Sequence, residues 1–462
     1  MNKKDNLSSE VRMGSAPVLK LIFSMSLPSM FSMLILALYN IVDSIYVSRL
    51  GEYALSALSL VYPIQMLNVA VGVGTGIGLA SLISRKLGEN RYDEAQMAAN
   101  HGVIIAVGSW IVFALFGIFG MGPFIRAFSD TPILIDAATK YGSIVCVGCL
   151  FAFNSTNAER IMQACGNMMA PMWCSLAGCI TNVILDPIMI FGYLGCPAMG
   201  VTGAAVATVI GQLVQMLCCF AVVNFAKLPI KIEIKLFKPN PSTIRQIYNV
   251  ALPSMVMQSI ASITTLALNA ILVSFSEAAV AALGVYFKLQ SFVFMPVFGM
   301  NQGVMPIMGY NYGAQNKKRL IEVFLKAMAI AFIIMSLGCL LFQLIPEVLM
   351  GFFDAEGELL AVGVKALKTI SLCFPIAALC IIAGSLFQAT GFGTYSMIVS
   401  IMRQIVVIIP AAFILSRIIG VMGVWYAYPI AEAMGLTVSA ILFKRLYDQR
   451  IKVMPDSKDN NN

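Results

Sequence analysis

The chain has 462 residues, of which 59% are hydrophobic and only 11% are charged, and its formal net charge is +8. A soluble domain carries roughly 25% charged residues, so this composition excludes a water-exposed globular surface and predicts an integral membrane protein. Long apolar stretches that contain prolines favour helices over a transmembrane barrel, whose strands alternate apolar and polar residues. The basic residues lie on short loops without interleaved aromatic residues, which argues against nucleic-acid binding.

Twelve apolar segments are long enough to cross a bilayer, which takes about 20 residues in a helix. We therefore predict an all-α protein with twelve transmembrane helices. In chain order the segments lie near residues 18–46, 54–82, 97–121, 138–157, 161–192, 200–225, 250–275, 279–308, 322–346, 360–387, 393–415 and 421–445.

The basic residues mark the side of the membrane on which the loops lie. They gather in the N-terminal "MNKK", in residues 84–91, 227–238 and 316–319, and after Phe443. The positive-inside rule places these loops and both termini in the cytoplasm. No small-residue cleavage site follows the first apolar segment, so we expect the first helix to be retained rather than removed as a signal peptide.

An internal repeat divides the chain into two halves of the same orientation, because six crossings separate the copies. The repeat pairs residues at an offset of 225, as in Pro28 with Pro253, Gly74 with Gly299, Gly78 with Gly303 and Gly88 with Gly313. We expect two pseudo-symmetric bundles related by an axis along the membrane normal. The predicted organisation is a cytoplasmic tail (1–17), a six-helix bundle (18–225), a basic linker (226–249), a second six-helix bundle (250–445) and a second tail (446–462).

Two short motifs do not support enzyme chemistry. Cys146 and Cys149 form a C-x-x-C inside an apolar run, without a second pair of ligands, and the chain has a single histidine, His101. Small buried helix residues explain this pattern better than zinc or redox chemistry. The glycine run at residues 72–78 lacks the spacing of a nucleotide loop and instead gives two small-xxx-small pairs for close helix packing. We predict no enzymatic activity, no cofactor and no metal centre.

Asp43 and Asp186 are the acidic residues that lie deepest in apolar segments, and Glu432 and the helix-end Glu159 are weaker cases. A charged side chain at mid-bilayer costs roughly 2.5–3.5 kcal/mol on insertion scales, so such a residue usually faces a cavity and has a function. Asp43 and Asp186 both follow long outward-running stretches, and we expect them at similar depth in the outer half of the membrane.

Other polar groups share the helix faces of these two carboxylates. Tyr39 and Asn40 precede Asp43 by one turn, and Asn182 precedes Asp186 by one turn. Pro187 has no N–H to donate to the carbonyl of residue 183, so we expect a bend there. These groups predict one small polar pocket that holds a proton or a monovalent cation. The alternative is that the two aspartates only cross-link helices through hydrogen bonds, and a structural role is also open for Glu432, Lys288 and Arg403.

Several motifs occur in the same order as in a known family and span nearly the whole chain. They are "LPSMFSMLILALYNIVDSIYVSRLG", "NVILDP", "GVTGAAVATVIGQ" and "MPIMGYNYGA". With these motifs the chain resembles the multidrug and toxic compound extrusion (MATE) transporters, in particular the DinF-like and MepA-like bacterial branch. The resemblance implies two six-helix bundles that form a V-shaped cleft, and efflux of cationic amphipathic compounds driven by H+ or Na+.

The family's functional residues carry over to Asp43 in Y-N-x-x-D, to Asn182 and Asp186 in N-x-x-x-D-P, and to Thr208 and Tyr141. Of these, Asp43, Tyr141 and Asp186 are also implied to contact the substrate. The chain departs from the NorM-like branch, which uses acidic residues in the second half. The seventh and tenth helices have no acidic residue in their interiors here, which argues against that site.

We therefore predict a secondary active antiporter that exports cationic drugs or dyes in exchange for H+ or Na+. Desolvation disfavours the charged form of a carboxyl group, so Asp43 is expected to take up and release a proton during transport. The 29 methionines suit a cavity that repacks around different ligands. We expect a monomer in the bacterial inner (cell) membrane, in contact with the lipid bilayer.

The main alternative is a flippase for lipid-linked oligosaccharides on a related fold. A flippase would favour cationic residues lining the cleft to hold a diphosphate, whereas here acidic residues are better placed. An intramembrane enzyme would need a catalytic dyad or a set of metal ligands, and a chain with one histidine has few residues suited to either. A passive channel would not need the two-half design.

Overall fold

The computed structural model describes residues 9–226, 228–233 and 238–455, and the regular elements in these ranges are helices. The first half of the chain forms α1 (Ser9–Ser15), α2 (Val18–Ser48), α3 (Glu52–Gly88), α4 (Tyr92–Leu115), the π-helical turn η2 (Phe116–Gly120), α5 (Met121–Arg126), α6 (Pro132–Ala164), α7 (Met169–Phe191), the 3-10 turn η3 (Tyr193–Gly195) and α8 (Val201–Phe225).

The second half of the chain repeats this pattern of long helices. It forms α9 (Pro241–Val273), α10 (Glu277–Gly313), α11 (Lys317–Leu344), α12 (Pro346–Gly351), α13 (Gly357–Ser371), α14 (Phe374–Ala389), α15 (Gly393–Ile401), the π-helical segment η5 (Met402–Ile408), α16 (Ile409–Ile419), α17 (Val421–Leu446) and the π-helical turn η6 (Tyr447–Ile451).

Eleven helical segments in the described ranges are long and apolar enough to cross a membrane, and α13 with α14, bent by 50° between them, makes a twelfth. This confirms the predicted all-α fold with twelve spans. Most helices extend beyond the predicted segments, because polar residues continue the helix past the apolar run. The predicted segment 161–192 instead begins too early, since residues 161–164 end α6 and α7 begins at Met169. The clearest case is α9, which begins at Pro241, so residues 241–249 of the predicted linker are helical.

The ends of the helices follow from local sequence. Ser276 and Asn316 are N-caps whose side chains accept hydrogen bonds from the backbone N–H groups of Ala279 and Arg319. Gly192 ends α7 with a φ of 79°, a left-handed conformation that costs glycine little because it lacks Cβ. The proline at which the sequence predicts a bend, Pro187, lies inside α7, and the helix continues past it to Phe191.

Two compact units emerge from the packing, and their boundaries fall inside α2 and α9. The first unit comprises Met1–Met13 and Phe31–Met255, and the second comprises Gly14–Met30 and Val256–Asn462. The beginning of α2 therefore packs within the second unit, and the beginning of α9 packs within the first. The predicted contiguous bundles, 18–225 and 250–445, differ from these units in those two segments.

Glycines permit both exchanged helix segments to pack closely. In the first unit, a Cβ added to Gly74 of α3 would lie 2.9 Å from the backbone nitrogen of Met255 in α9. In the second unit, a Cβ added to Gly299 of α10 would lie 2.6 Å from the Cα of Met30 in α2. The two contacts are related by the 225-residue repeat of the sequence. Small residues therefore allow helix backbones to touch at corresponding places in the two units.

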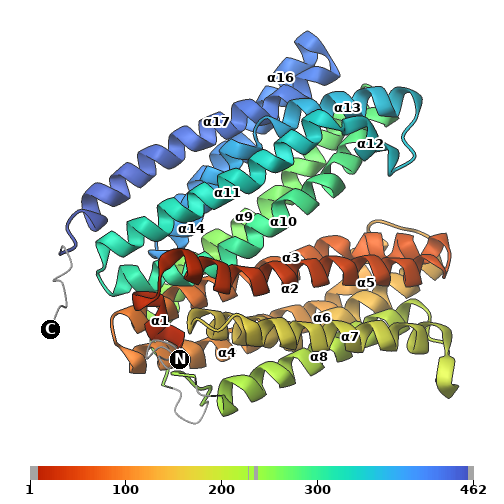
Figure 1. Ribbon diagram of the computed structural model, residues 1–462. Coiled ribbons are helices and arrows are strands. Elements are labelled where there is room, and N and C mark those ends of the chain that lie inside the picture. Colours follow the sequence, from red (N-terminus) through yellow and green to blue (C-terminus); the bar gives the residue numbers. More distant parts are fainter. Residues whose placement is uncertain (1–8, 227, 234–237, 456–462) are drawn as a thin grey trace. The chain divides into compact units, whose positions relative to one another are not determined.

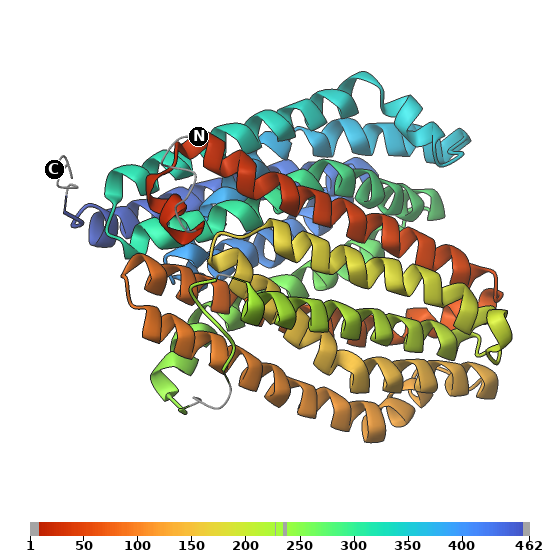
Figure 2. The same ribbon diagram turned by 60° about the horizontal axis from the view of Figure 1, so that its bottom comes forward.

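Within the first unit the long helices lie side by side, with α6 at the centre (Figures 1 and 2). Helix α6 packs against α3, α4 and α8, and α7 packs on the other side of α8. The core between α2, α3, α6 and α8 includes Val47, Val61, Tyr141 and Val201. This arrangement brings α2, α7 and α8, which carry most of the predicted site residues, to the same part of the unit. In the second unit α14 packs against α10, α11 and α17.

Residues 231, 233 and 240, which lie between α8 and α9, are held by side chains of α4. Gln96 donates to the carbonyl of Lys231 and accepts from its N–H, at 2.9 Å, while Asn100 accepts from the N–H of Glu233 at 3.0 Å. The fully buried His101 donates from Nδ1 to the carbonyl of residue 97 and accepts the Asn240 N–H at Nε2, at 3.0 Å. The single histidine therefore has a structural role in the described structure.

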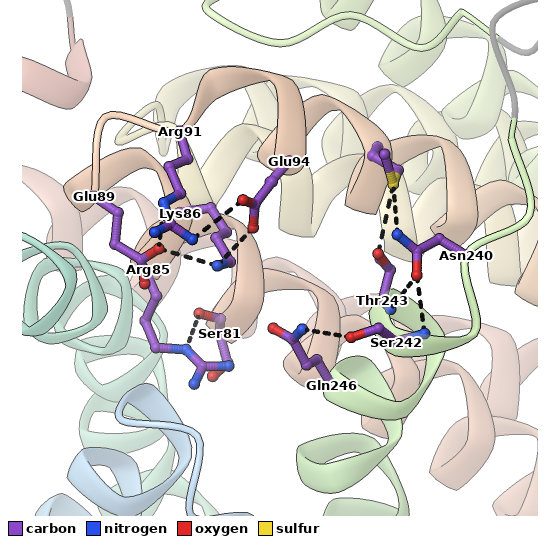
Figure 3. Close-up of polar contacts among 11 residues, drawn as sticks. Ser81, Arg85, Lys86, Glu89, Arg91, Glu94, Asn240, Ser242, Thr243 and Gln246 are labelled. Carbon is purple, nitrogen blue, oxygen red and sulfur yellow. Dashed lines mark hydrogen bonds and ion pairs between the residues drawn. The ribbon is translucent and has the colours of Figure 1, made fainter.

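The same end of the unit carries a charged cluster between α3 and α4 (Figure 3). Lys86 lies between Glu89, at 3.0 Å, and Glu94, at 2.7 Å, and Arg91 pairs with Glu94 at 3.2 Å. Ion pairs whose carboxylates stay partly exposed, as Glu89 and Glu94 do here, contribute about 0–1 kcal/mol each. Their main effect is to order the predicted cytoplasmic loop, whose positive charge they partly offset.

Candidate functional site

Asp43 of α2 and Asp186 of α7 lie together in the first unit. Asp186 is fully buried and Asp43 is half-buried. Their carboxyl groups are within hydrogen-bonding distance of each other. An ionised carboxylate only accepts hydrogen bonds, so a direct bond between the two groups forms only when one of them carries a proton and donates it. The sequence expectation that the two carboxyl groups converge agrees with this geometry.

Asn182 links this carboxyl pair to α8. With its amide turned so that both ends are satisfied, Nδ2 donates to Asp186 Oδ2 at 3.0 Å and Oδ1 accepts the Thr208 backbone N–H at 3.0 Å. Asn182 is 2% exposed, so both bonds are shielded from solvent. The spacing of four residues on α7 is what places the amide beside the carboxyl group.

Two tyrosines complete the site. The Tyr39 hydroxyl, from α2, is hydrogen-bonded to the Thr208 side chain. The Tyr141 hydroxyl, from α6, lies beside the carboxyl pair and accepts a hydrogen bond of 2.9 Å from Gln65 Nε2 of α3. Tyr141 is almost completely buried, and its hydroxyl proton stays available for another acceptor.

The structure thus places six of the seven predicted site residues together and adds one. The Asn40 side chain lies outside the described residues. Gln65 was missed by the sequence reasoning, because a lone polar residue in an apolar helix has no periodic signal. It lies two residues after Pro63 in an apolar stretch, and its polarity was the only available indication.

One oxygen of the carboxyl pair is buried without a protein donor. Apart from a proton shared with Asp186, no N–H or O–H group in the described ranges donates to Asp43 Oδ1. This oxygen can accept a proton or contact a cation. No group of three or more His, Cys, Asp or Glu side chains able to hold a metal ion occurs in the described ranges.

The other intramembrane charges have their own partners. Glu159 of α6 accepts from Ser175 Oγ at 2.5 Å and from Gln215 Nε2 at 2.8 Å. In the second unit, Arg403 Nη1 donates to both carboxylate oxygens of Glu432, at 3.1 and 3.2 Å, and the Lys288 ammonium lies 5.6 Å from the centre of the Phe353 ring. These contacts fit the structural roles left open for Glu432, Lys288 and Arg403.

Comparison with known proteins extends over the whole chain. The family model MatE matches residues 28–188 and 253–414, which are the two halves of the internal repeat. The chain is 27% identical over 450 residues to "Multidrug export protein MepA" of Staphylococcus aureus (strain MRSA252), covering 95% of this chain and 96% of the relative. It is 25% identical over 440 residues to MepA of Staphylococcus saprophyticus subsp. saprophyticus, covering 94% and 95%.

Solved structures agree with the sequence comparisons. The chain is similar to the protein in "Crystal structure of MATE in complex with MaL6", with a TM-score of 0.89, 25% identity, and coverage of 96% of this chain and 100% of that chain. The family match, the twelve spans and the repeated halves together identify the family. The chain belongs to the MatE family of multidrug and toxic compound extrusion transporters.

Proposed function

We propose that this chain exports cationic amphipathic drugs from the bacterial cell and that proton exchange at the Asp43–Asp186 pair drives the export. Relatives named as multidrug export proteins align with it over nearly its full length. The observation that carries the proposal is the contact between two carboxyl groups, one of them fully buried. Such a pair holds a shared proton and releases it only when the surroundings change.

The coupling follows from the charge of the pair. Two carboxyl groups that share a poorly solvated site titrate together, so the pair carries one proton over a wide pH range. Uptake of a second proton by the pair removes the last negative charge. The neutral and charged forms favour different solvation, and this difference can shift the balance between two conformations of the transporter.

The charge of the pair also selects the substrate. An anionic pair attracts an organic cation and repels an anion, and the Tyr39 and Tyr141 rings beside it offer aromatic faces. Cation–π contacts add about 0.5–2 kcal/mol, depending on desolvation. Uptake of a proton by the pair would weaken the attraction and release the cation. These features favour cationic drugs over the lipid diphosphate of the flippase alternative.

Sodium is the other candidate coupling ion. The Asp43, Asp186, Asn182 and Thr208 side chains supply oxygen atoms of the type that Na+ prefers, but the direct carboxyl–carboxyl contact favours a proton. We further propose that the protein acts as a monomer in the bacterial inner membrane, with both termini in the cytoplasm. The basic residues of the loops and tails support this orientation.

Dye efflux from proteoliposomes under separately imposed gradients tests the proposal. A proton gradient alone should drive export of a cationic aromatic dye, and a sodium gradient at equal pH should not. Efflux driven by sodium alone would replace the proton by Na+ in the mechanism. Transport of anionic or lipid-diphosphate compounds without transport of cationic dyes would favour the flippase.

A further inference from the structure

The first unit buries more polar groups than the carboxyl pair uses. Four side chains in α3 and α6 are 2–8% exposed and carry polar atoms with no nitrogen or oxygen hydrogen-bonding partner among the described residues. These atoms are the hydroxyl of Thr75, the amide oxygens of Asn154 and Asn157, and both amide atoms of Asn68, which has the Cys146 thiol of α6 beside it. Buried polar atoms in native proteins nearly always have a partner, and where the protein offers none, ordered water provides it.

These four side chains face one junction, between α3, α4 and α6. Asn68 and Thr75 are seven residues apart on α3, which puts them on the same helix face. Leu79, one turn beyond Thr75, packs against α4. A Cβ added to Gly102 of α4 would lie 2.6 Å from the Leu79 side chain. Asn157 of α6 donates from Nδ2 to the carbonyl oxygen of the same Gly102 at 2.8 Å. Both helix faces therefore point toward α4.

The junction begins at the carboxyl pair. The Tyr141 hydroxyl lies beside Asp43 and Asp186, and it accepts the hydrogen bond from Gln65. Gln65 is one turn before Asn68 on α3. From there the polar groups continue along α3 and α6 toward their last residues, Gly88 and Ala164, the ends that the positive-inside rule places in the cytoplasm.

An apolar cluster interrupts this series of polar groups. Phe113 of α4 and Phe153 of α6 meet edge to face, with their ring centres 5.7 Å apart, and pack with Cys149. The Phe153 ring lies against Gly72, where an added Cβ would be 3.1 Å from it. Gly72 is midway between Asn68 and Thr75 on α3. The two rings therefore separate Asn68, on the side of the carboxyl pair, from Thr75, Asn154 and Asn157 on the other side.

We propose that ordered water binds at these groups on both sides of the Phe113–Phe153 pair and forms a proton path from the carboxyl pair to the cytoplasmic end of the first unit, closed at the two rings. The proton leaves a carboxyl group for the adjacent water, which leaves a carboxylate behind, and passes from water to water as hydronium. The amide and hydroxyl groups orient the water and do not ionise. This inference rests on the proposed proton exchange.

Removal of single polar groups tests the water sites in full-length protein reconstituted in proteoliposomes. Thr75→Val keeps the side-chain shape and removes the hydroxyl, and it should slow proton-driven dye efflux several-fold at unchanged dye affinity. Thr265→Val is the matched control, because the Thr265 hydroxyl is exposed and bonded to the carbonyl of residue 261, and it should transport normally. If Thr75 had no ligand, Val would raise the thermal stability and leave the rate unchanged, which would overturn the proposal.

Removal of the ring pair tests the closure. Phe153→Ala should admit protons through the unit without dye, seen as faster collapse of an imposed proton gradient, because the carboxyl pair exchanges protons with the opposite side. Phe153→Leu keeps an apolar side chain and should not leak protons. Phe119→Ala, at a site that is 73% exposed, should not leak protons either.

The two proposals fail in different ways. If an imposed proton gradient does not drive dye efflux by the wild-type protein, the proposed function is wrong, and the proton path is then wrong as well. If wild-type efflux follows the proton gradient while Thr75→Val transports at the normal rate and Phe153→Ala stays tight, the path is wrong and the proposed function stands. The near-isosteric Thr75→Val keeps the test decisive if Phe153→Ala does not fold.

Discussion

Replacement of Asp43 and Asp186 by asparagine, singly and together, distinguishes one shared proton site from two independent cross-links. Each amide keeps the shape of the side chain but cannot take up a proton at the pH of a cell. If transport needs the shared proton, either single variant should lose nearly all proton-driven efflux, and the double variant should lose little more. Asp43→Asn should still reach the membrane, because the fold does not need the charge.

The size of the effect follows from the contact between the two groups. A hydrogen bond to an ionised group contributes about 1.5–3 kcal/mol, which is the coupling energy expected in a double-mutant cycle. A loss of about 2–3 kcal/mol corresponds to a roughly 30- to 150-fold slower efflux in each single variant. Substitution of the fully buried Asp186 should lower the thermal stability more than substitution of Asp43, because it also disturbs the hydrogen bond from Asn182.

The assay is a double-mutant cycle measured twice, on the initial rate of dye efflux under a proton gradient and on thermal stability in detergent. Losses that add in both measurements would refute the shared site and support independent cross-links. Normal pumping by Asp43→Asn would show that Asp43 is structural.

Three further predictions concern the surroundings of the pair and the packing of the first unit. Asn182→Leu removes the bonds to Asp186 and to α8, and should lower proton-driven efflux more than it lowers dye binding, as separate rate and affinity measurements would show. Gln65→Leu removes the donor to Tyr141 and should slow efflux several-fold, and an unchanged rate would mean that the Gln65 bond does not position the hydroxyl. Gly78→Ala would bring a Cβ within 2.5 Å of a carbonyl oxygen of α9 and should lower stability by about 1–3 kcal/mol, whereas Gly108→Ala, with no atom within 4 Å, should be neutral or stabilising in the same denaturation assay.

The sequence carried most of the information about the fold. Apolar length alone located all twelve spans, because a helix that crosses lipid must be apolar over about 20 residues. It missed that α9 begins at Pro241, since residues 241–249 are polar and lie before the apolar run. It also missed that the beginnings of α2 and α9 pack in exchanged units, because contiguous segments were assumed to pack together.

The part of the site in which polar side chains lie one turn apart on the same helix could be predicted. Asp186 and Asn182 are four residues apart, and a carboxyl group in an apolar segment is costly enough to be noticed. Gln65 and the buried amides of α3 and α6 could not be found this way. Uncharged polar residues are common in membrane helices, and only the packed structure shows which of their oxygen and nitrogen atoms lack a partner within the described ranges.

The most direct test of the account is to measure proton movement caused by the drug. Addition of a cationic dye to one side of proteoliposomes, with no pH or sodium gradient imposed, should drive protons in the opposite direction, because exchange coupling is reciprocal. A pH indicator inside the vesicles would report the flux, which Asp43→Asn should abolish. Dye movement by the wild-type protein without any change in internal pH would contradict proton exchange at the Asp43–Asp186 pair.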